Sequence, residues 1–107
     1  MPKYLFEVDY SAEGTRGLIK DGGTRRRAVV EKAVKASGGK LETFYFTFGT
    51  RDAVVIVDLP DNATAAAVSL AVSATGAVAF KTTVLLTPAE LDEAVKKPVG
   101  YKPPGAA

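Results

Sequence analysis

The amino-acid sequence predicts a single α+β domain in which four β-strands are connected by helices. The chain has 107 residues, the usual size of one domain. Hydrophobic residues make up 47% and charged residues 24%, as in ordinary globular proteins. Segments of alternating polarity take turns with segments in which apolar residues recur every three or four positions. We assign residues 1–97 to the domain and residues 98–107 to a tail rich in proline and glycine.

Four segments have the side-chain pattern of β-strands. Residues 4–10 place Tyr, Phe and Val on one face and acidic residues on the other, and residues 40–48 alternate in the same way. Residues 53–59 are apolar on both faces, which is typical of a central strand, and residues 49–52 form the turn of a hairpin before it. Residues 78–86 alternate again and predict the fourth strand.

Three segments have the spacing and the capping residues of helices. Residues 25–37 follow Thr24, which can cap the helix, and residues 63–75 follow an aspartate and an asparagine. Thr87 begins a capping box with Pro and Glu behind it, which predicts a helix that reaches about residue 97.

The first connection has a weaker helical pattern. Residues 11–14 can start a short helix, but we expect Gly14, Gly17 and the Asp-Gly-Gly stretch at residues 21–23 to weaken it and to break or kink it. The resulting order, β-α-β-β-α-β with a further helix at the end, is the ferredoxin-like arrangement. It predicts an antiparallel sheet of strand order 4-1-3-2 with helices on one face.

Composition narrows the classes of function. Fourteen basic and twelve acidic residues give a net charge of +2, so we expect neither a nucleic acid nor a membrane as partner. The sequence has no cysteine and no histidine, so we expect no metal and no cofactor. No segment has the length of a membrane span or the core of a signal peptide, and we expect a cytoplasmic protein.

Polar side chains share one face of the predicted sheet, and this face is either solvated or covered by a partner. One interpretation is a pocket between two facing sheets, with a carboxylate as base and a tyrosine or lysine as acid or hydrogen-bond donor. The other is an interface or exposed face held by ion pairs. The candidate residues are Glu7, Asp9, Tyr45, Thr47 and Lys81.

Three consecutive arginines, Arg25, Arg26 and Arg27, follow two glycines at the start of a predicted helix. Cations in a first helical turn oppose the helix dipole. A phosphate or carboxylate held by this turn would offset that repulsion, which makes the arginines a candidate anion site. The alternative is a basic turn that faces water.

Several of these features together resemble the GYD domain family. They are the opening strand, the glycine pair at 38–39, the turn at residues 49–52, the strand after it and the Pro-Asp exit at 60–61. Gly49 and Asp52 match the Gly-x-Tyr-Asp motif of the family, and Arg51 stands where the motif has tyrosine. The resemblance implies a dimeric α/β-barrel, in which the sheets of two chains face each other, and it implies no established activity.

We therefore expect a homo-oligomer, at least a dimer, that binds a small molecule or serves as a structural protein. One alternative, implied by the same resemblance, is a cofactor-independent enzyme similar to small monooxygenases, acting on an organic substrate between the sheets. Another is a protein-interaction or regulatory module that uses a strand edge, the arginine turn or the tail. The sequence does not decide whether the chain is an enzyme.

Overall fold

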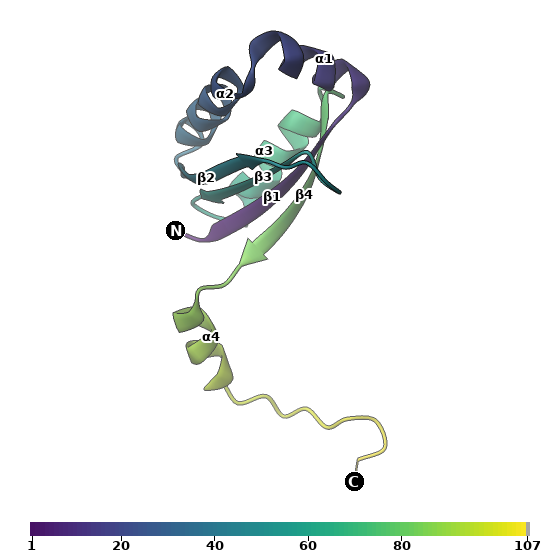
Figure 1. Ribbon diagram of the computed structural model, residues 1–107. Helices are drawn as coiled ribbons and strands as arrows, with labels where there is room; N and C mark the ends of the chain where they lie inside the picture. The colour runs from purple at the N-terminus through teal and green to yellow at the C-terminus, as the bar shows by residue number, and fades with distance from the viewer. Residues whose placement is uncertain (107) are drawn as a thin grey trace.

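The computed structural model describes residues 1–106 and contains one four-stranded antiparallel sheet. Its strand order, β2-β3-β1-β4, is the predicted one. The hairpin of β2 and β3 therefore forms one half of the sheet, and β1 lies between β3 and β4 (Figure 1). The strands are β1 (Lys3–Tyr10), β2 (Lys40–Phe46), β3 (Ala53–Asp58) and β4 (Val78–Leu85).

Three helices cover one face of this sheet (Figure 1). They are α1 (Ala12–Asp21), α2 (Gly23–Ala36) and α3 (Asn62–Ser73). No described element of the chain covers the opposite face, which we call the open face and which carries Leu5, Val54 and Ile56. The α+β class, the antiparallel sheet and the helices on one face agree with the prediction.

The hydrophobic core lies between the sheet and the three helices. Tyr4, Phe6 and Val8 of β1 are all buried, and the residues between them face the other way. Phe6 pairs with Val55 across the sheet and packs against Phe80 with 5.0 Å between the ring centres. The predicted division of β1 into an apolar and a polar face is therefore confirmed.

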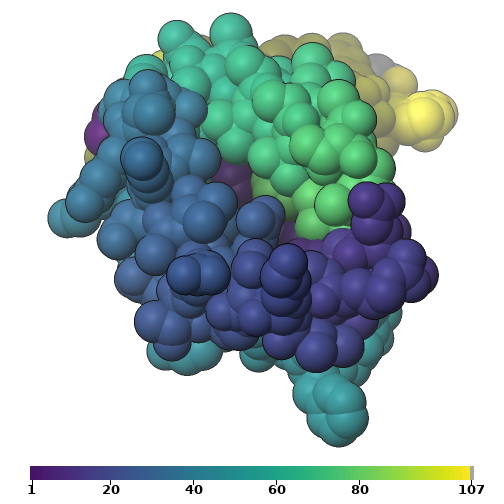
Figure 2. Space-filling model, turned by 90° about the horizontal axis from the view of Figure 1, so that it is seen from above, coloured from purple at the N-terminus to yellow at the C-terminus, as the bar shows by residue number. Residues whose placement is uncertain are grey.

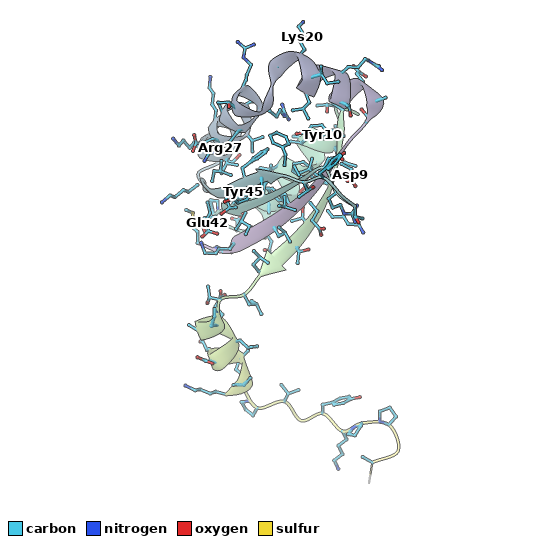
Figure 3. All side chains as sticks on the ribbon, in the orientation of Figure 1. Asp9, Tyr10, Lys20, Arg27, Glu42 and Tyr45 are labelled. Carbon is cyan, nitrogen blue, oxygen red and sulfur yellow. The ribbon has the colours of Figure 1, made fainter. Side chains whose placement is uncertain are left out.

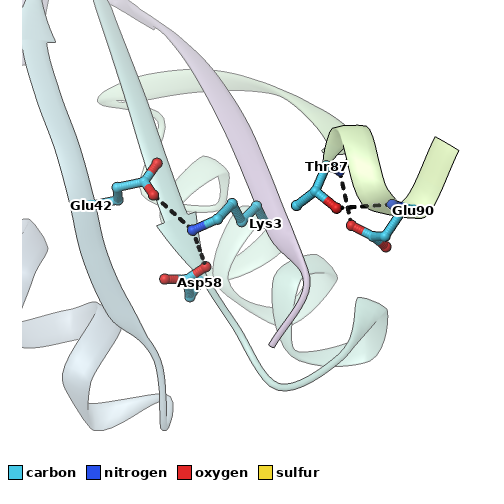
Figure 4. A network of polar contacts seen from close by, with 5 residues as sticks. All are labelled: Lys3, Glu42, Asp58, Thr87 and Glu90. Atoms are coloured by element: carbon cyan, nitrogen blue, oxygen red, sulfur yellow. Dashed lines mark hydrogen bonds and ion pairs between the residues drawn. The ribbon is translucent and has the colours of Figure 1, made fainter. Parts of the chain in front are cut away.

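A β-bulge in β2 corrects the alternation predicted for residues 40–48. The register shifts between Leu41 and Thr43, so Glu42 is an extra residue in the ladder. Leu41 consequently shares the helix side with Phe44, whereas strict alternation had placed the two on opposite faces. The bulge leaves the Glu42 carboxylate 2.7 Å from Lys3 Nζ, which also bonds Asp58 at 2.9 Å (Figure 4).

The first helix agrees with the prediction in part: it ends at Asp21, before Gly22, but it is not broken at Gly14 or Gly17. Helix α1 is continuous through Gly14, because that glycine is needed for packing: a Cβ there would collide with the carbonyl oxygen of Ala77. Ser11 caps the helix by accepting a hydrogen bond from the Gly14 N–H, and its own N–H donates to the same Ala77 oxygen at 2.9 Å. Close contact with the start of β4 thus outweighs the low helix propensity of glycine.

Helix α2 begins earlier than predicted. Its N-cap is Gly22 rather than Thr24, and Gly22 adopts a φ of 80°, which favours glycine. The N–H of Gly22 donates to Leu18 at the end of α1, so one glycine ends the first helix and starts the second. This arrangement places all three arginines inside the first turns of α2.

The last helix, α4 (Pro88–Val95), has the predicted capping box of Thr87 and Glu90 (Figure 4) and ends at Val95 rather than near residue 97. It projects from the domain together with the following residues, so the described chain is 62 Å long and 31 by 23 Å across (Figure 1). Its apolar side chains, Leu91 among them, are exposed. None of the helices in residues 1–106 has the length and apolarity to cross a bilayer.

Candidate functional site

Helices α2 and α3 leave an internal space above the middle of the sheet. Helix α2 packs on edge strand β2, and α3 packs on edge strand β4. Figure 2, which looks down on the helices, shows a hollow between the blue α2 and the green α3, with purple atoms from the N-terminal part of the chain at its base. We call this space the interhelical cavity, and its volume is about 120 Å³.

The lining of the interhelical cavity is almost entirely apolar. Helix α2 contributes Val29 and Val30, α3 contributes Val68 and Val72, and aromatic rings of the sheet close the floor. Arg26 and Tyr10 are the two lining residues with polar side-chain groups. A molecule in this space therefore meets branched aliphatic side chains on most sides and a cation at one place.

Arg26 is the unusual member of the lining. Its Nε is buried and has no hydrogen-bond partner, a condition met by no other side-chain nitrogen or oxygen in residues 1–106. An unsatisfied buried donor of this kind costs about 1–3 kcal/mol or more. Arg26 thus lines an apolar space and carries a donor that has no partner in the described residues.

The three consecutive arginines do not act as one group. Arg27 makes an ion pair with Glu31 at 3.7 Å, on an exposed side of α2. Arg25 is exposed to solvent, and Arg26 alone lines the interhelical cavity. Successive helical residues point about 100° apart, which explains why a run of three separates in this way.

On the open face, three of the predicted pocket residues lie in one row across the sheet. Tyr45 pairs with Val54, Val54 with Glu7, and Glu7 with Lys81. Asp9 lies two residues further along β1, on the same face (Figure 3). Tyr45 and Lys81 are exposed, and Glu7 is partly buried. The fifth residue, Thr47, instead closes the hairpin, where its hydroxyl donates to the Arg51 carbonyl.

The comparison with known families decides what kind of domain carries these features. A family model for the GYD domain matches residues 4–95, which include all four helices and the whole sheet except its first residue, Lys3. The chain belongs to the GYD domain family. No match was found among curated proteins or among solved structures. The GYD domain is a family of unknown function, and it contains both the interhelical cavity and the open face.

The motif residues of this GYD domain connect the β2–β3 hairpin to strand β1. Arg51 bonds Asp9 at 2.7 Å and lies 3.5 Å from the Glu7 carboxylate. The hydrogen bond with Asp9 is the main cause of a raised pKa of Arg51, and Glu7 contributes less. Asp52 accepts a hydrogen bond from the Tyr10 N–H at 2.8 Å. This bond satisfies a backbone donor of β1 that lies past Ala53, the first residue of β3.

The open face of the GYD domain has an apolar middle and charged ends. Leu5 pairs with Ile56 at its centre, next to Val54. One end carries Glu7, Asp9 and Arg51, and the other carries Lys3, Glu42 and Asp58, all joined by ion pairs. Bonds with Asp58 and Glu42 raise the pKa of Lys3. An apolar centre with a charged rim is the usual composition of a protein interface.

The interhelical cavity of the GYD domain was not predicted from the sequence. One signal was present, because Arg26 precedes Val30 by four residues and Val34 by eight. This spacing places the arginine on the apolar face of its helix. A cation on the buried face of an amphipathic helix is uncommon and indicates a specific role.

Proposed function

We propose that this GYD-domain chain binds a small organic molecule in the interhelical cavity and that it works as a homo-oligomer, at least a dimer, which pairs its open faces. The observation that carries the first part is the cavity itself, about 120 Å³ of apolar space between two helices. An engineered cavity of roughly 150 Å³ in another protein accommodates benzene, so the space suits a single ring or a short branched chain.

Energetics support a binding role over a structural one. Protein interiors are normally packed as densely as organic crystals. The interhelical cavity departs from this rule, because side chains leave about 120 Å³ beside the core unfilled. Local loss of stability is typical of sites that bind a ligand.

Toluene is a suitable first probe, because it has the size of the cavity and no polar group. Eight valines line the cavity, Val68 among them, and their methyl NMR signals report on its contents. We expect toluene to shift these signals and to leave Val54, on the open face, unchanged. Val68→Phe fills the space and abolishes the shifts, whereas Leu70→Phe, at an exposed position of the same helix, preserves them. Cavity signals that stay unchanged at saturating toluene would exclude this function.

The proposed dimer rests on the composition of the open face, where the apolar centre has no cover in the described chain. Ile56 is at that centre, so Ile56→Arg places a charge in the middle of the interface. Sedimentation velocity is expected to give a dimer or larger assembly for the native chain and a monomer for Ile56→Arg. Ala67→Arg, at an exposed position of α3, is the matched control and leaves assembly unchanged. A native chain that is monomeric up to millimolar concentration rules the dimer out.

The alternative of a cofactor-independent enzyme is favoured by one observation, the row of Tyr45, Glu7 and Lys81 on the open face. Two facing copies of this row would supply acids and bases to a substrate between the sheets. Ion pairing of Glu7 and Asp9 with Arg51 weakens that case, because these carboxylates already have a partner within the chain. Any substrate turnover found for the assembled protein can be compared with that of Glu7→Gln. Loss of turnover in this variant would favour the enzyme, and unchanged turnover would argue against a role of this row in catalysis.

The third interpretation, a protein-interaction module, would use the edges of the sheet. Strands β2 and β4 each have one side without a partner in the described chain. Pairing of open faces leaves these edges free, so the interaction role is compatible with a dimer. Amide hydrogen exchange of β4 that stays fast in the assembled protein would show that this edge is free and would support the interaction role. Slow exchange of β4 in the assembly would argue against it.

A further inference from the structure

We propose that the ligand of the interhelical cavity is an organic monocarboxylate with a compact apolar body and that Arg26 binds its carboxylate. The inference rests on the proposed function, because it names the chemical class that the cavity takes. It starts from the buried Arg26 Nε, which has no hydrogen-bond partner in residues 1–106. Arg27 and Arg51 both have carboxylate partners, whereas Arg26 has none within the described chain.

The chemistry of the donor selects the head group. A guanidinium offers parallel N–H donors in a planar fork that matches the two oxygens of a carboxylate. The charge of Arg26 has no counter-ion inside the described chain, so an anion is favoured over a neutral amide or alcohol. Tyr10 is the other lining residue with a polar side-chain group, and its hydroxyl can donate a hydrogen bond.

The remaining lining selects the body of the ligand. Valines of α2 and α3 and the rings of Phe44 and Phe80 surround the space, and they offer no polar partner to a hydroxylated or doubly charged molecule. A volume of about 120 Å³ limits the body to roughly one ring. Benzoate combines the required head and body, and it is the probe that we choose.

Two carboxylates of α1 compete with an external ligand for Arg26. Glu13 and Asp21 line a second hollow together with Arg26, and this hollow shares Tyr10, Arg26 and Val78 with the interhelical cavity. Neither makes an ion pair with Arg26 in the structure, where the guanidinium Nε remains unpartnered. If Glu13 or Asp21 were the partner of Arg26, replacing that carboxylate with its amide would alter the preference for benzoate.

The test compares benzoate with benzamide, its neutral isostere, and with toluene by NMR titration of the full chain at pH 7. We expect the native protein to bind benzoate roughly tenfold or more tightly than benzamide, as a charge-assisted bidentate bond predicts. Arg26→Met keeps the aliphatic stem and is expected to lose this preference while still binding toluene. Arg25→Met, at the exposed neighbouring position, keeps the preference.

The outcomes separate the two proposals. Toluene binding without a preference for benzoate overturns the carboxylate assignment and leaves the proposed function standing, whereas failure of all three probes removes both. Inorganic phosphate that binds as tightly as benzoate also overturns the assignment, and so does an Asp21→Asn or Glu13→Gln variant that abolishes the preference. If Arg26→Met fails to fold, Arg26→Lys is used in its place. A preference of Arg26→Lys for benzoate over benzamide equal to that of the native chain would contradict bidentate binding by the guanidinium.

Discussion

Arg51 ties the β2–β3 hairpin to the neighbouring strand β1 by donating a hydrogen bond from Nη1 to Asp9 Oδ2 over 2.7 Å. The same guanidinium lies 3.5 Å from Glu7, so one cation holds two carboxylates that would otherwise repel each other along β1. Arg51 occupies the position at which the Gly-x-Tyr-Asp motif has its tyrosine. The arginine therefore has a structural task of its own on the open face.

Replacing this arginine tests that task. Arg51→Met is expected to lower the midpoint of urea unfolding, because Glu7 and Asp9 then lose their shared partner. The loss is expected to be smaller than that caused by Gly14→Ala, since partly exposed ion pairs contribute little. Arg27→Met, which removes the exposed pair with Glu31 at 3.7 Å, is the matched control and leaves the midpoint unchanged. Equal effects of the two variants would contradict a special role of Arg51.

Two glycines of α1 are predicted to respond oppositely to the same substitution. Gly14→Ala drives a Cβ into the backbone of Ala77 and is expected to destabilise the fold by about 1–3 kcal/mol. Gly17→Ala meets no heavy atom within 4 Å and is expected to stabilise it by roughly 0.5–1 kcal/mol through helix propensity. Chemical denaturation measures both changes. A loss of stability in both variants would contradict the open space at Gly17, and a gain in both would contradict the close contact between Gly14 and Ala77.

Asp61 links stability to pH. Hydrogen bonds from the side chain and then the backbone of Thr64 lower the pKa of Asp61 below its ordinary value of 3.8. A lowered pKa in the folded state means that Asp61 stabilises the protein above about pH 4 and that this contribution disappears as pH falls through the lowered value. Asp61→Asn keeps a capping group but does not titrate, so it is expected to lose less stability than the native chain between pH 6 and pH 2.

The pH effect is measured by urea unfolding at both pH values. Asp92→Asn, at an exposed position of α4, controls for the removal of one carboxylate. Parallel stability losses in native protein and Asp61→Asn would show that the α3 cap does not contribute to acid unfolding.

The buried hydroxyl of Tyr4 is predicted to contribute to stability through one hydrogen bond. Tyr4 is only 1% exposed, and its hydroxyl donates to Asn62 Oδ1 at 2.6 Å, at the first residue of α3. Tyr4→Phe is expected to cost about 1 kcal/mol, the usual net value of such a bond. Tyr101→Phe removes an exposed hydroxyl of the tail and is expected to cost nothing. A double-mutant cycle with Asn62→Ala assigns the loss to this pair, and additive effects would contradict it.

Local patterns in the sequence predicted much of this fold because they are decided by neighbouring residues. The alternation of β1 and the capping box at Thr87 both follow from short-range geometry, and both are present in the structure. The continuity of α1 was not predictable, because it depends on a contact between Gly14 and Ala77, which are far apart in sequence. Propensity argued for a break, and tertiary packing overrode it.

The two candidate sites differ in the same way. The row from Tyr45 through Glu7 to Lys81 follows from strand order and alternation, and the sequence placed these residues on one face. The interhelical cavity depends on how far apart α2 and α3 stand, which no local pattern specifies. Only the position of Arg26 on the apolar side of its helix indicated that something other than core packing occurs there.

The bulge at Glu42 has a consequence for how this chain is aligned with relatives. Removing Glu42 would restore a regular ladder, in which Leu41 still pairs with Val57 and Thr43 with Ile56. The core would keep its residues, and only the carboxylate that bonds Lys3 would be lost. A relative shorter by one residue at this point is therefore expected to preserve the sheet, and a single gap opposite Glu42 is the alignment that keeps every strand pair in register.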